Sequence, residues 1–174
     1  MIKSKRYIIF SVQIIAAAVL TLIDQWIKKL AVTHLMGKED IVLIKNFIGL
    51  SYAENTGAAF SAFSDSTMLL SIVTLVLLAG GVIFLLLGKI KGKILNTCAV
   101  LILAGGAGNL IDRFAQGYVV DYIKTLFIDF PVYNFADCLV CVGAFSLVIY
   151  LIYEIIRDTK AEKLKKQGGD NQNG

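Results

Sequence analysis

Two aspartates, Asp121 and Asp137, are the residues of this chain whose type and surroundings best suit acid–base chemistry. Both lie in strongly apolar sequence, and Lys124 is the only basic residue between them. An ionised carboxylate is costly to bring near lipid, so an acid in such a place usually has a function. Asp137 is followed by uncharged residues as far as Glu154, which puts it at the mouth of an apolar segment. We therefore expect Asp121 and Asp137 to meet at one face of a bilayer.

Two neighbouring carboxyl groups cannot easily both ionise, so they tend to share one proton. The ionised member can take a proton from water while the protonated member donates a hydrogen bond to a scissile carbonyl. Such hydrolysis needs no metal and no cofactor, and the chain has only one histidine, His34. The same residue types leave other interpretations open. Asp137 could cap a helix, intramembrane acids could serve a proton- or ion-coupled transporter, and the chain could be a non-catalytic membrane scaffold.

The composition favours a membrane protein, since 57% of the residues are hydrophobic and the mean hydropathy is +0.73. A helix needs about 20 mostly apolar residues to cross a bilayer. Four stretches come close to this length without charged residues in their interior. We predict an all-α integral membrane protein with four transmembrane helices, at about residues 7–24, 66–88, 94–112 and 136–156.

The basic residues predict the orientation of these helices. Lysines and arginines gather before the first helix, between the second and third, and after the fourth, whereas the other two connections carry most of the acids. By the positive-inside rule, both termini are then cytoplasmic. The net charge of +4 reflects this anchoring and gives no indication of nucleic-acid binding. The first apolar run is too long for a cleaved signal peptide, so we interpret it as a retained helix.

Residues 38–65 are too mixed to span a membrane, and we expect them on the outer surface. Two runs of strand-forming residues there, 41–45 and 48–52, are separated by Asn46 and Phe47, which predicts a small hairpin. We treat residues 1–160 as one membrane domain and residues 161–174 as a polar cytoplasmic tail without regular structure.

Polar pairs one helical turn apart occur in the first and third predicted helices. Asp24 and Lys28 can form an ion pair, although a pair snorkelling toward the membrane surface would look the same. Asn109 and Arg113 project on one side and could bind a carboxylate or a backbone carbonyl, or could simply end the helix. Glycines just before Asn109 favour close helix packing. The three cysteines, Cys98, Cys138 and Cys141, are expected to be apolar packing residues.

Five segments, taken together, resemble the successive signature blocks of the bacterial lipoprotein signal peptidases, also called signal peptidase II. They appear in that family's order and cover the chain from the first helix to about Gly143. The blocks are Asp24-x-x-x-Lys28, Asn55-Thr-Gly-Ala-Ala-Phe-Ser61, Gly108-Asn-Leu-Ile-Asp112-Arg113, Gly117-Tyr-Val-Val-Asp121 and Phe130-Pro-Val-Tyr-Asn134-Phe-Ala-Asp137.

This resemblance implies an aspartic endopeptidase of the bacterial cytoplasmic membrane, with its active site toward the extracytoplasmic face. It would cleave the signal peptide from diacylglyceryl-modified prolipoproteins on the N-terminal side of the lipidated cysteine. Asp121 and Asp137 match the catalytic pair. The supporting or substrate-binding residues would be Asp24, Lys28, Asn55, Gly57, Asn109, Arg113 and Asn134. The resemblance also implies an outer β-rich cradle, contact with membrane lipid and sensitivity to globomycin-like inhibitors. No metal, cofactor or nucleic acid is expected, and the protein is expected to act as a monomer.

Overall fold

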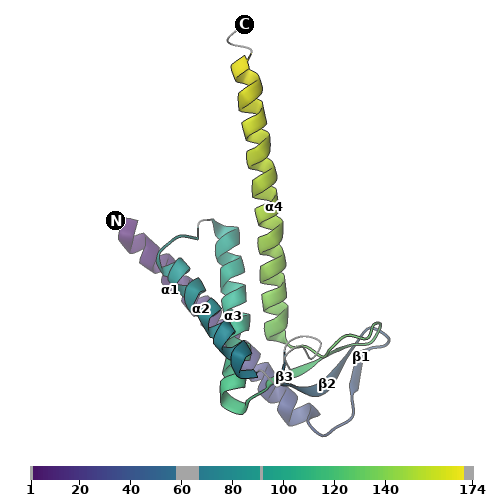
Figure 1. The fold of residues 1–174 in the computed structure, drawn as a ribbon. Helices are drawn as coiled ribbons and strands as arrows, with labels where there is room; N and C mark the ends of the chain where they lie inside the picture. Colours follow the sequence, from purple (N-terminus) through teal and green to yellow (C-terminus); the bar gives the residue numbers. More distant parts are fainter. Residues whose placement is uncertain (1, 58–66, 91, 171–174) are drawn as a thin grey trace.

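Four long helices and a small sheet make up the protein (Figure 1). The computed structural model describes residues 2–57, 67–90 and 92–170, with side chains for 6–57, 67–90 and 92–160. The elements in chain order are α1 (Ile2–Leu35), β1 (Ile41–Ile44), β2 (Ile48–Asn55), α2 (Thr67–Leu86), α3 (Lys93–Gln116), β3 (Val119–Thr125) and α4 (Phe135–Asp170). Parts of three predicted segments lie outside the described residues. These are residues 58–65 of the mixed segment 38–65, residue 66 at the start of the second predicted helix, and residues 171–174 of the tail.

All four helices contain stretches long and apolar enough to cross a bilayer, which confirms the predicted helical membrane fold. These stretches are Arg6–Leu35, Thr67–Leu86, Lys93–Gln116 and Phe135–Lys160. The first helix does not end near Asp24, as the charge pattern suggested, but continues to Leu35. It can do so because Asp24 and Lys28 are paired with each other and buried inside the protein.

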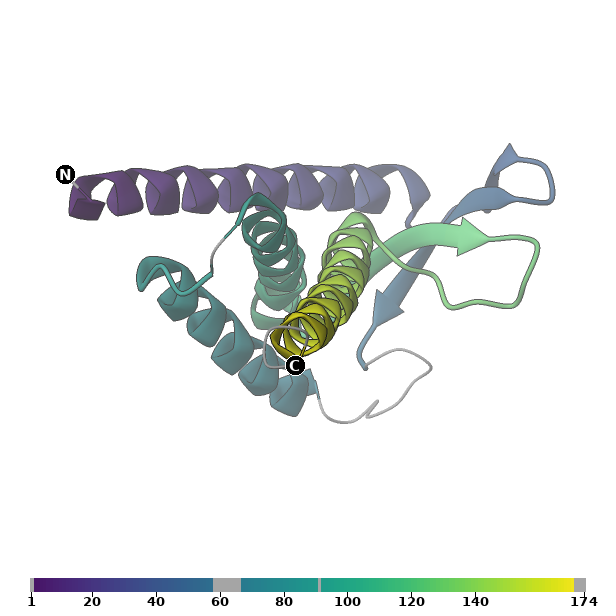
Figure 2. The same cartoon turned by 90° about the horizontal axis from the view of Figure 1, so that it is seen from above.

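The third helix, α3, is the centre of the helical part: it packs against α1, α2 and α4 (Figure 2). Its glycines permit this packing, as predicted. A methyl group added at Gly105 would overlap the carbonyl oxygen of Ala136 on α4, and one added at Gly108 would overlap a carboxylate oxygen of Asp24 on α1. The backbones therefore approach closely where the three helices meet.

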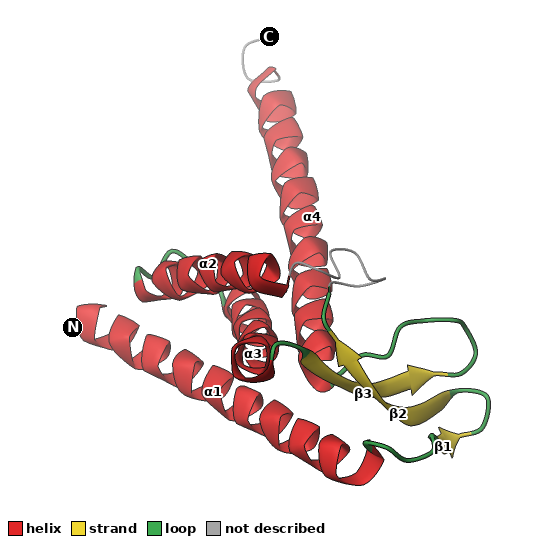
Figure 3. Cartoon of the chain, turned by 60° about the horizontal axis from the view of Figure 1, so that its bottom comes forward, coloured by secondary structure: helices red, strands yellow, loops and turns green. Residues whose placement is uncertain are grey.

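The sheet has three antiparallel strands in the order β1-β2-β3 and lies at one end of the helices (Figure 3). The predicted hairpin is confirmed, with Asn46 in the left-handed region (φ 56°) at its turn. The third strand was not predicted. β3 comes from the connection between α3 and α4 and pairs along β2, with Val119 opposite Asn55 and Asp121 opposite Ala53. The sheet therefore joins the connection between α1 and α2 to the connection between α3 and α4.

α1 begins and α4 ends on the same side of the molecule, at the end away from the sheet (Figure 1). The connection between α2 and α3 lies on that side too. The expectation that the tail lacks regular structure is wrong as far as Asp170, because α4 continues to that residue. Residues 158–167 contain no proline, and seven of these ten residues are lysine, alanine, leucine or glutamate, which are good helix formers.

Candidate active site

Asp121 lies within β3 and is almost completely buried, with 1% of its surface exposed. Each carboxylate oxygen accepts a hydrogen bond from an asparagine amide. Asn55 Nδ2, at the end of β2, donates to Oδ2 at 2.9 Å, and Asn134 Nδ2 donates to Oδ1 at 2.6 Å. The pairing of β2 with β3 brings Asn55 to this position. The strand thus holds the carboxylate in one orientation.

Asp137 lies in the first turn of α4 and forms a reciprocal cap with Asn134. The backbone N–H of Asp137 donates to Asn134 Oδ1 at 2.9 Å, and the backbone N–H of Asn134 donates to Asp137 Oδ2 at 3.1 Å. The other oxygen, Oδ1, accepts from Asn109 Nδ2 at 2.7 Å. Asp137 is therefore a capping residue, as the alternative interpretation had it, while its carboxylate also belongs to a larger polar cluster.

Asn134 connects the two acids, because its side chain donates to Asp121 and its backbone donates to Asp137. Its Nδ2 also lies 3.1 Å from Asn109 Oδ1, which closes the cluster. The structure thus brings together Asp121 on β3, Asp137 on α4, Asn109 on α3 and Asn55 on β2. The sequence separations are large, and the four elements meet only in the folded protein.

A cavity of about 360 Å³ lies beside Asp137. Asn55, Gly57 and Arg113 line it together with apolar and sulfur-containing side chains. These are Phe130, Pro131, Val132, Tyr133, Cys138 and Cys141. Asp137 borders this space directly, whereas the buried Asp121 lies behind it. Burial raises the pKa of the Asp121 carboxyl to about 6, and the negative charge of Asp137 adds to the effect, while the hydrogen bonds from Asn55 and Asn134 oppose it.

Arg113 places a positive charge at the edge of the same cavity. Its Nη2 lies 3.4 Å from the carbonyl oxygen of Gly57. Its Nε is buried and has no hydrogen-bond partner among the described residues. The backbone N–H of Gly57 donates to Asn55 Oδ1 at 3.0 Å, so the turn after β2 is held against the site. A guanidinium at the edge of a cavity can donate to an oxygen that enters it.

Behind the site, Lys28 on α1 is buried with 3% of its surface exposed and has three acceptors. Its Nζ lies 3.0 Å from Asp24 Oδ2, 2.9 Å from Asp112 Oδ2 and 2.8 Å from Asn109 Oδ1. The predicted Asp24–Lys28 pair therefore exists, and the interpretation that it snorkels at the surface is wrong. Because Lys28 takes the carbonyl oxygen of Asn109, the amide nitrogen of Asn109 is directed at Asp137.

Sequence reasoning missed Asp112 and Gln25, which both belong to this buried cluster. Gln25 Nε2 donates to Asp112 Oδ1 at 2.9 Å and to the carbonyl of Gly108 at 3.1 Å. Asp112 Oδ2 also accepts the backbone N–H of Val120 at 3.1 Å, next to Asp121. The signal for Asp112 was present, because it stands between Asn109 and Arg113 in one of the quoted blocks. No pattern in the sequence marks Gln25.

The cysteines differ from one another. Cys98 is buried, as expected of a packing residue, but Cys138 is partly exposed and Cys141 is exposed. The expectation of apolar packing thus fails for Cys141, which lines the cavity beside Asp137. Within the described part of the chain, no three His, Cys, Asp or Glu side chains are grouped in a way that could hold a metal ion.

A membrane protein with two acids sharing one asparagine beside a cavity has the construction of an intramembrane aspartic hydrolase, and similar proteins agree. Residues 16–153 match the family model described as Signal peptidase (SPase) II. A lipoprotein signal peptidase of Clostridium tetani is 41% identical over 136 residues, which cover 76% of this chain and 87% of that one. One from Enterococcus faecalis is 37% identical over 158 residues, 90% of this chain and 95% of that one.

Solved structures show the same fold. A bacterial membrane enzyme, determined by the in meso method at 2.3 Å resolution, superposes with a TM-score of 0.77 at 28% identity, covering 83% of this chain and 90% of that one. A second, determined at 1.9 Å, gives 0.72 at 29% identity and covers 81% and 92%. The chain belongs to the signal peptidase II family and is an aspartic-type peptidase. These comparisons give no support to a transporter.

Proposed function

We propose that the protein cleaves the signal peptide from diacylglyceryl-modified prolipoproteins, on the N-terminal side of the lipidated cysteine. The family and the names of the relatives support this substrate. The observation that carries the chemistry is that Asp121 and Asp137 both accept hydrogen bonds from Asn134 at the mouth of a membrane helix. Asp121 lies on β3 and Asp137 on α4, so only the folded protein brings the two carboxylates to the same asparagine.

Asp121 and Asp137 act as a general acid/base pair that shares one proton. The ionised carboxylate takes a proton from water as the water attacks the scissile carbonyl, and the protonated carboxyl stabilises the carbonyl oxygen. The proton then passes to the leaving amine, so that the peptide bond breaks and the pair returns to its starting state.

The surrounding residues position the reacting groups. Asn55, Asn109 and Asn134 hold the two carboxylates by donating to their oxygens. Arg113 and the carbonyl of Gly57 border the cavity and supply a donor and an acceptor for an extended peptide backbone. Asp24 and Lys28 position the site without bordering the cavity. Lys28 donates to the side-chain oxygen of Asn109, and Asp24 accepts the backbone N–H of Ala136 at the start of α4.

The position of the site fits a lipid-linked substrate. We place the peptidase domain at residues 1–160 of the bacterial cytoplasmic membrane, with the sheet and active site on the extracytoplasmic face. Support comes from the excess of lysine and arginine near both termini and between α2 and α3. Every group proposed for catalysis comes from one chain, which suits a monomer that a globomycin-like inhibitor would block by occupying the cavity.

The direct test is a gel-shift assay that follows cleavage of a diacylglyceryl prolipoprotein in lipid or detergent. Asp121→Asn and Asp137→Asn should each lower the rate by about 10²–10⁴-fold, the usual contribution of a general acid or base. Asp40→Asn is a matched control. Its side chain is 46% exposed in an ion pair with Lys124 on the sheet, so its rate should stay near that of the unchanged enzyme. Retention of the normal rate by either folded test variant would contradict the proposed pair.

A further inference from the structure

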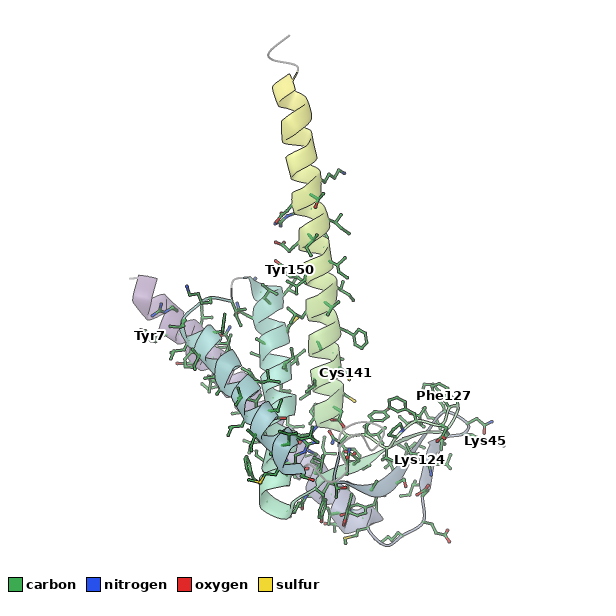
Figure 4. All side chains as sticks on the ribbon, in the orientation of Figure 1. Tyr7, Lys45, Lys124, Phe127, Cys141 and Tyr150 are labelled. Atoms are coloured by element: carbon green, nitrogen blue, oxygen red, sulfur yellow. The ribbon has the colours of Figure 1, made fainter. Side chains whose placement is uncertain are left out.

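Two of the three cysteines lie within the cavity beside Asp137. Cys138 and Cys141 are three residues apart on α4, so they share a helix face, and both border the same space as Asp137 and Arg113. Cys141 lies on the part of α4 nearest the sheet, a little above the sheet in Figure 4. Its distance from Asp137 along the helix is about 6 Å, from a rise of 1.5 Å per residue. Any group attached to Cys141 would therefore stand next to the proposed catalytic pair.

The three thiols differ sharply in access. Cys141 is exposed and Cys138 is partly exposed, whereas Cys98 has only 2% of its surface exposed. Access and thiolate formation together decide how fast a cysteine reacts. Cys141 should then react first, Cys138 later and Cys98 slowest.

We propose that Cys141, with Cys138 beside it, makes this cavity a covalent attachment site for small, uncharged, thiol-reactive electrophiles such as maleimides. The cavity wall supports a preference for apolar reagents, since Phe130, Pro131, Val132 and Tyr133 line it. A volume of about 360 Å³ holds one small ring with its substituent, but not that group and a peptide together. Attachment therefore excludes the substrate.

The chemistry is a conjugate addition. The thiol of Cys141 gives its proton to water, and the thiolate sulfur attacks one carbon of the maleimide double bond. A C–S bond forms, the C=C π bond breaks, and the neighbouring carbon takes a proton from water. The net change is addition of S–H across the double bond, with no oxidant and no leaving group. The attachment itself is independent of the enzyme's activity, but the loss of cleavage that follows rests on the proposed function.

The test treats the purified full-length protein with N-ethylmaleimide and locates the adducts by peptide mass spectrometry at successive times. Cys141 should be modified first and Cys98 last. Lipidated prolipoprotein present at ten times its Kd should slow modification of Cys141 about tenfold, because only the unoccupied cavity reacts. Equal rates at all three cysteines, or a rate at Cys141 that the substrate does not change, would overturn the attachment site.

Cleavage is measured in the same samples, each variant being compared with its own untreated rate. Full modification of Cys141 should lower cleavage below about a tenth, because a filled pocket cannot bury a second ligand. Cys141→Ser and the double variant with Cys138→Ser should lose this sensitivity, whereas Cys98→Ser should keep it. Normal cleavage by a fully modified enzyme would refute the blocked cavity. An untreated enzyme that cleaves nothing would instead refute the proposed function, and the modification rates would still decide the attachment site.

Discussion

At the scale of single residues, the carboxyl group of Asp121 combines burial with two amide donors. Burial raises its pKa from the ordinary 3.8 to about 6. In the unfolded chain the group would titrate near its ordinary pKa. Between these two values the folded protein binds more protons than the unfolded chain does. The free energy of unfolding must therefore decrease as the pH rises through this window, and then level off.

The comparison of Asp121→Asn with the unchanged protein tests this directly, because the variant lacks the titrating group. From pH 4 to pH 7 the difference in unfolding free energy should move in favour of the variant by about 2 kcal/mol, since this pH range covers most of a pKa shift of about two units. SDS titration in mixed micelles at both pH values measures the difference. Loss of the carboxylate's acceptors will also lower the variant's stability at every pH, so only the change with pH is informative. A difference that does not change with pH would show that Asp121 titrates normally.

The sequence predicted several of these residues because helical spacing is a local property. Asp24 with Lys28, and Asn109 with Arg113, could be placed on common faces by counting residues. Counting could not reveal that Lys28 also reaches Asp112, or that Gln25 bridges α1 and α3. These contacts depend on how two helices cross, and the crossing depends on close approach at Gly108. The pairing of Lys28 with Asp112 therefore depends on tertiary structure and could not be predicted from spacing within one helix.

At the scale of elements, Asp24 ties two distant helices together. It lies on α1, is fully buried, and accepts the backbone N–H of Ala136 at the start of α4 at 3.0 Å. Its other oxygen holds Lys28, which in turn holds Asn109. The first turn of α4 carries Asp137, so the position of that carboxylate depends on α1. Asp24 itself borders neither the cavity nor Asp121.

For Asp24→Asn we expect loss of stability and a partial defect in cleavage. Breaking a buried ion pair typically costs about 3–5 kcal/mol, and the remaining partner Asp112 should keep the cost near the lower end. Asp40→Asn, which breaks an exposed pair, should cost less than about 1 kcal/mol. SDS titration and the cleavage assay measure both variants. Complete loss of cleavage in a normally stable Asp24→Asn protein would mean that Asp24 takes part in catalysis.

The helices and the hairpin were predictable, but the third strand was not. Long apolar runs and a short two-residue turn are visible in one segment of sequence. β3 is only seven residues long, and it becomes a strand because the hairpin offers it an edge. Its pairing partner lies more than sixty residues earlier in the chain, at Asn55. The short segment around Asp121 was therefore recognisable as a motif but not as a strand.

At the scale of the whole molecule, the site lies where the helical part meets the sheet. The cavity borders the start of α4, and exposed apolar side chains lie on the sheet and its loops, among them Phe127 (Figure 4), which stacks with Phe47. With the proposed substrate, acyl chains could thus remain in the bilayer while the peptide bond reaches the acids. Transfer of each additional buried CH₂ group into lipid contributes about 0.8 kcal/mol. Most of the substrate's binding free energy should come from its lipid.

A peptide of the same sequence without the diacylglyceryl group should therefore be a poor substrate. We expect kcat/KM to fall by more than about a hundredfold, since losing even four buried CH₂ groups at about 0.8 kcal/mol each would suffice. Cleavage of the lipidated and unlipidated peptides by one preparation in lipid nanodiscs provides the measurement. Equal turnover of the two peptides would contradict a lipid-dependent site.

The order of synthesis determines when the hydrogen-bonded cluster around Asp121 and Asp137 can form. Asp24 and Lys28 leave the ribosome first, Asn55 follows, and Asp121, Asn134 and Asp137 come only with the final connection and helix. Neither acid has all of its hydrogen-bond donors until Asn134 and the start of α4 are in place beside α3. A partly inserted chain consequently carries no working peptidase. The proposed activity therefore appears only after the last helix has been inserted.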